Sequence, residues 1–159
     1  MQRSLTLRPN GNEFLLEARQ AFHAPLDKVF TFFSKAENLE QITPDILDFR
    51  ILNTQPIAMK VGAEICYRIK IHGIPIRWKT NIDAWEPGVR FIDRQVSGPY
   101  RKWEHEHLFE VEGETTVVKD IVNYYPFGGR LIHSLFVKKD LEKIFSYRQE
   151  ALAKIFTEV

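Results

Sequence analysis

The stretch that decides the fold is WEHEHLFEVEGETTVVKDIVNY, residues 103–124. In its first half the odd positions carry Trp103, His105, His107, Phe109 and Val111, while most even positions carry glutamate. Alternation with period two predicts a β-strand with one buried and one solvated face. After Gly113, residues 115–124 are expected to form the next strand of an antiparallel hairpin.

The odd face of the first strand places two histidines among aromatic side chains. Directly opposed residues of an antiparallel pair share a face, so the turn decides what the histidines meet. A two-residue turn at 112–113 puts His105 opposite Asp120, and a four-residue loop puts His107 opposite Asp120. Both alternatives keep Asp120 and Tyr124 inward, whereas a three-residue loop would turn Lys119 inward, which is unfavourable.

The rest of the chain extends this hairpin into an α+β fold. Alternation predicts further strands over 64–71, 76–85 and 90–96, and a first strand over 14–22 follows a polar lead-in. A helix is expected from Pro25 to Phe33 and a second short helix over 37–42. From residue 131 the apolar period becomes 3.6, which predicts one long C-terminal helix. Its apolar stripe consists of Leu131, Leu135, Leu141, Ile144, Phe145, Leu152, Ile155 and Phe156. The expected architecture is a curved antiparallel sheet wrapped around the long C-terminal helix, with two short helices after the first strand.

Composition limits the class of protein. The chain has 159 residues, which suits one domain with one core. Its 22 basic and 21 acidic residues give a net charge of +1, so no nucleic-acid or anionic-membrane partner is expected. Cys66 is the single cysteine, which excludes an intramolecular disulfide. No apolar run has the length of a signal peptide or a membrane span, so a cytoplasmic protein is expected, of undetermined oligomeric state.

Five motifs resemble the SRPBCC superfamily, whose START-like, helix-grip members include birch-pollen-allergen-type and polyketide cyclase/dehydratase-like proteins. The motifs are AP-x₃-VF-x-FF at 24–33, AENLEQITP at 36–44, IRWKTNIDAWEP at 76–87, QVSGPYRKWEHEHLFE at 95–110 and D-x-V-x-Y-x-P at 120–126. The closest likeness is to small stand-alone bacterial domains. It covers about residues 14–157, within a single domain that spans residues 1–159. The resemblance implies an internal cavity between sheet and helix, and it does not narrow the ligand.

Polar residues on inward faces are the candidates for chemistry. Arg148 lies on the helical stripe, where its charge needs a partner such as Asp120. If the cavity binds a hydrophobic or amphipathic ligand, such as a lipid, quinone or polyketide-like molecule, its contacts come from this set of inward residues: Tyr67, Trp78, Trp103, His105, His107, Phe109, Asp120, Tyr124 and Arg148. His23, His72 and His133 are expected to be solvated.

Three interpretations of the inward polar set remain open. It can be a buried hydrogen-bond network that fixes the sheet against the helix, or it can orient the polar end of a ligand. It can also be a metal site, but no third histidine lies beside the pair, so neither metal nor cofactor is predicted.

The alternative to a non-catalytic binding protein is a cyclase/dehydratase-type enzyme with His105, His107 and Asp120 as its proton-transfer groups. A partner-binding module with a closed core is a further class. A cavity above about 300 Å³ would support binding or catalysis.

Overall fold

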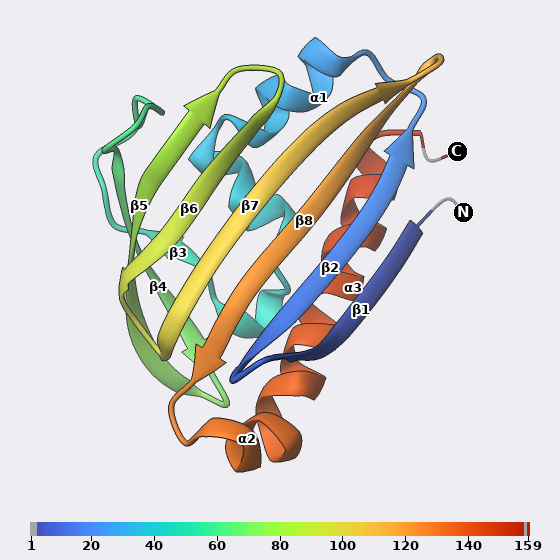
Figure 1. Cartoon of the computed structure of the whole chain (residues 1–159). Coiled ribbons are helices and arrows are strands. Elements are labelled where there is room, and N and C mark those ends of the chain that lie inside the picture. Colours follow the sequence, from blue (N-terminus) through green and yellow to red (C-terminus); the bar gives the residue numbers. More distant parts are fainter. Residues whose placement is uncertain (1–2, 158) are drawn as a thin grey trace.

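The computed structural model describes residues 3–157 and residue 159. All eight strands form one antiparallel sheet in the order β1-β2-β8-β7-β6-β5-β4-β3, and the sheet curves around the C-terminal helix (Figure 1). The strands are β1 (Arg3–Asn10), β2 (Glu13–Phe22), β3 (Arg50–Ile51), β4 (Glu64–Ile71), β5 (Ile74–Glu86), β6 (Arg90–Ser97), β7 (Tyr100–Glu112) and β8 (Thr115–Pro126). The predicted α+β helix-grip architecture is confirmed.

The helices lie on the concave side of the sheet. Helix α1 (Leu26–Phe33) and the 3₁₀ segments η1 (Ala36–Ile42) and η2 (Asp45–Leu47) follow strand β2. Helix α2 (Gly129–Ile132), the π-helical turn η3 (His133–Val137) and helix α3 (Lys138–Ile155) run on from one another after β8. Helix α3 spans the sheet in Figure 1, so its buried side and the inner sheet face enclose the core.

The N-terminal segment differs from the prediction, because the polar lead-in is strand β1. It pairs with β2 along its whole length, with Asn10 opposite Glu13. Gly11 and Asn12 form the two-residue turn, and Gly11 has a φ of +62°, as tight hairpin turns require. At the edge of the sheet only Leu5 and Leu7 reach the core, so the strand carries a weak apolar signal. The short helices therefore follow the second strand and not the first.

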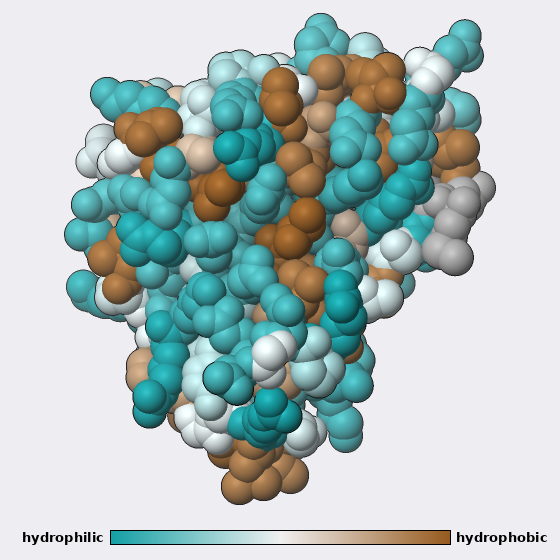
Figure 2. Space-filling view, viewed as in Figure 1, coloured by the Kyte–Doolittle hydropathy of each residue, from teal (hydrophilic) through white to brown (hydrophobic). Residues whose placement is uncertain are grey.

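The predicted apolar stripe of the last helix is buried in its middle and at Phe156, but not at its beginning or at Ile155. Leu141, Phe145 and Leu152 are buried, but Leu131 is 68% exposed and Leu135 54% exposed. The π-helical turn has more residues per turn than an α-helix and shifts the apolar phase. Helix α2 also projects beyond the end of the sheet in Figure 1, and apolar side chains gather at the same end of the surface in Figure 2. Ile155, at the other end of the stripe, is 38% exposed.

No helix among the described residues is long and apolar enough to cross a lipid bilayer. The buried apolar residues lie between sheet and helix, in clusters built around residues such as Leu16, Trp103 and Phe145 at one end. A second cluster, around Phe22, Phe30 and Phe109, joins α1 to the sheet at the other end. The region between these two clusters contains the polar residues of β6, β7 and β8.

Candidate functional site

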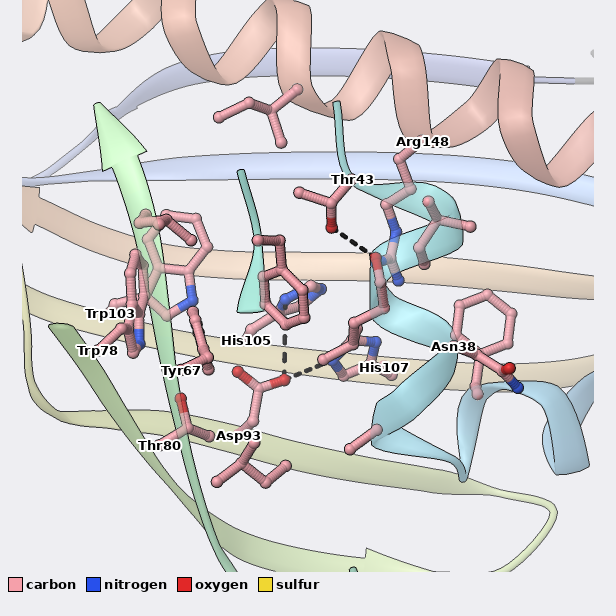
Figure 3. A pocket seen from close by; sticks show the side chains of 18 of the residues that line it. Asn38, Thr43, Tyr67, Trp78, Thr80, Asp93, Trp103, His105, His107 and Arg148 are labelled. Carbon is pink, nitrogen blue, oxygen red and sulfur yellow. Dashed lines mark hydrogen bonds and ion pairs between the residues drawn. The ribbon is translucent and has the colours of Figure 1, made fainter. Parts of the chain in front are cut away.

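A cavity of about 180 Å³ lies between the inner face of the sheet and helix α3 (Figure 3). Strands β4 to β7, segment η1 and helix α3 all contribute to its wall, which is mostly apolar. The exposed Lys35 also lines it, so the cavity reaches the surface at the start of η1. The volume is below the expected 300 Å³ but above the roughly 150 Å³ that accommodates benzene in an engineered apolar cavity.

The structure divides the nine predicted ligand-binding residues into two groups. Those on the cavity wall are Tyr67, Trp78, Trp103, His105, His107 and Arg148. Phe109, Asp120 and Tyr124 are buried but are not part of the wall. Contact with a ligand stays a prediction for the first group, and the second group lies where it can only support the wall.

The β7–β8 register places His107 opposite Asp120, as in the second predicted alternative. The predicted four-residue loop is wrong, because the strands are joined by a two-residue turn at Gly113 and Glu114, one position later than the turn of the first alternative. The Asp120 carboxylate faces three cationic or imidazole groups at once. Its Oδ1 lies 2.7 Å from Nε2 of His105, 3.3 Å from Nδ1 of His107 and 3.1 Å from a guanidinium nitrogen of Arg148. Burial alone would raise the pKa of Asp120, but Arg148 and the two histidines hold it well below its usual range. Asp120 therefore anchors helix α3 to the sheet behind the cavity wall.

Asp93 on strand β6 is the polar residue of the site that the sequence did not reveal. It lies opposite His105, and its Oδ2 is 2.6 Å from Nε2 of His107 and 3.8 Å from Nδ1 of His105. It lines the cavity, and 20% of its side-chain surface stays accessible. Burial raises the pKa of Asp93, but the two imidazoles outweigh burial and lower it. An ionised carboxylate therefore forms part of the cavity wall.

The β6 face that carries Asp93 could not be read from alternation. Phe91, Asp93 and Gln95 alternate with Ile92, Arg94 and Val96, so both faces mix apolar and polar residues. A two-residue turn at Gly98–Pro99 would place Asp93 opposite Glu104, on the outer face. Instead, the pairing is displaced by one residue, and the neighbouring ladders shift register at Lys79/Thr80 and at Tyr100/Lys102. Such irregularities change the face of the sheet to which side chains point, and here they bring Asp93 to the inner face, opposite His105.

The two stacked histidines have different acid–base properties. Their ring centroids are 3.7 Å apart. Burial, together with the neighbouring His107, lowers the pKa of His105. Burial also opposes the charged form of His107, but hydrogen bonding and attraction from Asp120 and Asp93 raise its pKa overall. His107 thus carries the proton more readily, between two carboxylates.

Asp93 adds a carboxylate beside the two histidines as a third possible metal ligand, where the sequence offered no third histidine. Ligand atoms of Asp93, His105 and His107 all lie within 4.8 Å of one another, and two histidines with one carboxylate can bind a transition metal. However, the imidazole planes are stacked with only 24° between them, so an ion in the plane of one ring would lie well outside the plane of the other. One shared ion would require ring rotation and loss of the short His107–Asp93 contact. The observed contacts between these histidines and aspartates are those of a hydrogen-bond network.

His133 contradicts the expectation of a solvated side chain. It is buried, its Nε2 lies 2.8 Å from the Tyr124 hydroxyl, and its ring stacks on Phe14 at a centroid distance of 3.5 Å. The π-helical turn that begins at His133 directs this residue toward the sheet. His23 and His72 are exposed as expected, and His72 lies 2.8 Å from Asp140.

A curved antiparallel sheet around a long terminal helix, with a cavity between them, defines the helix-grip fold. The family model described as polyketide cyclase / dehydrase and lipid transport matches residues 22–152. The chain belongs to this family, which confirms the resemblance to SRPBCC proteins.

Solved structures support the same fold. Protein CV1439 from Chromobacterium violaceum has a TM-score of 0.71 at 12% identity, with 93% of this chain and 98% of that one covered. Ginseng major latex-like protein 151 from Panax ginseng has a TM-score of 0.64 at 15% identity, covering 92% and 99%. Ara h 8.0201 has a TM-score of 0.58 at 15% identity, covering 87% and 97%. None of the curated proteins matches the chain. At these identities the likeness concerns the fold alone.

Proposed function

We propose that this protein binds a small hydrophobic or amphipathic molecule in the cavity between sheet and helix α3. The observation that supports this function is the cavity itself, because its wall combines many apolar side chains with a few polar ones. Ile65, Ile69 and Phe145 are among the apolar wall residues, and Asp93 and His107 are among the polar ones. Ligand sites in proteins have this character: apolar area supplies affinity and a few polar groups fix orientation.

The polar groups on the wall are held in place before any ligand arrives. His107 is fixed between Asp93 and Asp120, and Asp120 is held by Arg148 from helix α3. A network in which most hydrogen-bond partners are already present loses little conformational entropy on binding. The site is thus suited to orient the polar end of a ligand whose apolar part lies among the aromatic residues.

Acid–base catalysis is the second candidate function, and one contact favours it. The short Asp93–His107 contact, 2.6 Å, is on the cavity wall, so a bound molecule can reach a carboxylate–imidazole pair. Such a pair can take up and return a proton near neutral pH. Under this function Asp93 and His107 replace Asp120 as the groups nearest a substrate. His107→Ala should then abolish turnover of an enolisable aromatic ketone in a protein that remains folded.

Native mass spectrometry of freshly purified protein tests the binding function. We expect an added mass that organic solvent releases and that can be restored with 4-propylphenol, a probe of about the cavity's size. The matched control is Ala36→Phe, because Ala36 is a buried wall residue and a phenyl ring there fills the cavity. If the native protein carries no added mass and takes up no more probe than Ala36→Phe, the proposed function is wrong.

A further inference from the structure

Five large apolar side chains are exposed at one end of the molecule. They are Ile74 at the start of β5 and, between β8 and α3, the residues Phe127, Leu131, Leu135 and Phe136. Each is at least half exposed, from 50% for Phe136 to 68% for Leu131. Helix α2 projects beyond the sheet at this end in Figure 1, and apolar side chains gather there in Figure 2. These five residues are called the apolar tip.

Neighbouring elements pack against the apolar tip and join its parts. His72 of the β4–β5 turn lies 2.8 Å from the Asp140 carboxylate at the start of α3, and its ring meets that of Phe136 at a centroid distance of 6.1 Å. On the other side, the guanidinium of Arg101 lies over the Phe127 ring, 5.4 Å from its centroid. Exposed apolar residues that are gathered in this way indicate an interaction site.

The same end of the molecule is basic. Residues 65–82, 94–103 and 121–139 contain ten of the 22 basic residues of the chain and none of its 21 acidic ones. These stretches include the β4–β5 turn, the β6–β7 turn and the β8–α2 junction, which lie at one end of the antiparallel sheet (Figure 1). The β7–β8 turn at the opposite end carries Glu112 and Glu114. The net charge of +1 therefore conceals a local excess of positive charge.

Four exposed basic residues adjoin the apolar tip in the chain or in space: Arg101, Arg130, Lys138 and Lys139. None of them forms an ion pair with another residue of the described range 3–157. Arg130 donates only to a neutral acceptor, the backbone carbonyl of Gly11 at 3.2 Å. Their charges are therefore available to an anionic partner.

We infer that the apolar tip docks on the surface of an anionic lipid bilayer. Apolar side chains that protrude beside lysine and arginine match both parts of such a surface, because they enter the boundary of the acyl chains while the cations attract anionic head groups. A nucleic acid would match the charge and leave the apolar residues in water. A second copy of this chain would cover the apolar residues but bring two basic ends together, which is unfavourable.

The cavity wall begins beside this surface. Ile71 and Tyr100 line the cavity. They directly precede His72 and Arg101, whose side chains contact the apolar tip. Docking therefore brings one end of the cavity wall to the bilayer. The docking does not depend on the proposed function, because it uses exposed residues that are not part of the cavity wall.

Vesicle flotation at low ionic strength tests the inference. The probes are vesicles of phosphatidylcholine with roughly one third phosphatidylserine, and vesicles of phosphatidylcholine alone. We expect native protein to bind the anionic vesicles about tenfold or more tightly than the neutral ones, and added salt to weaken this preference.

Two double variants separate the apolar and the basic contributions. Leu131→Ser with Leu135→Ser should weaken binding to anionic vesicles about tenfold or more, because less apolar surface enters the bilayer. Lys138→Gln with Lys139→Gln should cause a loss of about the same size on anionic vesicles and little change on neutral ones. All four side chains are exposed, so the urea midpoints of both variants should match that of native protein.

Matched controls lie at the opposite end of the molecule. Val111→Ser changes an apolar residue of β7 that is 59% exposed, and Lys28→Gln changes an exposed lysine of α1. Both variants should bind anionic vesicles as native protein does. A loss of binding in these controls equal to that in the tip variants would overturn the assignment of the docking surface.

Other outcomes identify a different occupant. If native protein does not bind anionic vesicles, or if both double variants bind them unchanged, the inference is wrong. Self-association that light scattering detects and that Leu131→Ser with Leu135→Ser abolishes, without vesicle binding, would assign the tip to a second copy of the chain and overturn the bilayer. None of these results affects the proposed function, which uptake of 4-propylphenol tests separately.

Discussion

Two buried histidine clusters connect the C-terminal helix to the sheet, and only one of them faces the cavity. The cavity cluster consists of Asp93, His105, His107, Asp120 and Arg148; the end cluster consists of Phe14, Tyr124 and His133. The cavity cluster is rich in charge, and its Asp93 stays accessible. The end cluster pairs the Tyr124 hydroxyl with the His133 imidazole, and the ring of Phe14 stacks on that imidazole. Both clusters are buried and hydrogen-bonded. The accessible carboxylate of Asp93 distinguishes the cavity cluster from the end cluster.

Within the cavity cluster, the two carboxylates of Asp120 and Asp93 have different roles. Asp120 faces Arg148 and both histidines but does not reach the cavity, so it braces the helix. Asp93 touches the same histidines from the other side and faces the cavity. The same imidazoles therefore link a structural carboxylate to an accessible one.

The largest effect is expected from Asp120→Ala. Removing this carboxylate leaves Arg148 buried without its counter-charge, which should lower the free energy of unfolding by about 3–5 kcal/mol. Urea denaturation followed by tryptophan fluorescence measures the loss. Arg148→Met and the double variant complete a mutant cycle, in which the double variant should be more stable than the sum of the single losses implies. Strict additivity would show that the two charges do not stabilise each other.

A smaller effect is expected from Tyr124→Phe in the end cluster. The change removes the hydroxyl that lies 2.8 Å from His133, so the free energy of unfolding should fall by about 1–2 kcal/mol. Because Tyr124 is not on the cavity wall, the affinity for 4-propylphenol should change less than twofold. Differential scanning calorimetry and titration of the same sample check both statements. A strong loss of affinity would place Tyr124 in the ligand site, as the sequence alone suggested.

The smallest effect is a difference in pH dependence between the clusters. Burial, with a further contribution from Lys138, lowers the pKa of His133, so its folded state resists protonation and stability falls as pH drops below about 6.5. The pKa of His107 is raised, so its contribution is complete below about 6.5 and declines as pH rises through the folded-state pKa.

Urea midpoints measured from pH 5 to 9 test these opposite signs. His133→Gln should flatten the acid side of the stability curve, where His105, also with a lowered pKa, keeps part of the slope. His107→Gln should flatten the alkaline side. His72→Gln, at an exposed histidine, is the surface control. If His133→Gln flattened the alkaline side instead, the alkaline decline in stability would belong to His133 and not to His107.

The fold was predictable because its main signals are local. Alternation in β7 and β8 fixed the inward faces of His105, His107 and Asp120, and helical spacing located α3. Strand β1 was missed because an edge strand buries only Leu5 and Leu7, although Gly11-Asn12 is a hairpin signal. The exposed Leu131 and buried His133 depend on a π-helical turn, which the 3.6-residue period does not anticipate.

The site was predictable only in part. Alternation placed His105 and His107 on the inner face, and the unpaired charge of Arg148 pointed to Asp120. Asp93 was not predictable from β6, because its position depends on register shifts in two neighbouring ladders. The distinction between wall and brace depends on where the cavity lies, and that follows from the packing of the whole sheet against helix α3.

The irregular stretch around Gly98–Pro99 has an evolutionary consequence. The side chains of Gln95 and Tyr100 lie beside it, and the Gln95 amide bonds the Tyr100 backbone at both its carbonyl, 2.7 Å, and its amide, 3.1 Å. Because this stretch sets the pairing of β6 with β7, the gain or loss of one residue there would exchange the face that β6 presents. Relatives with the same wall residues on β7 can therefore diverge in ligand preference through a length change in a surface turn, without any substitution inside the cavity.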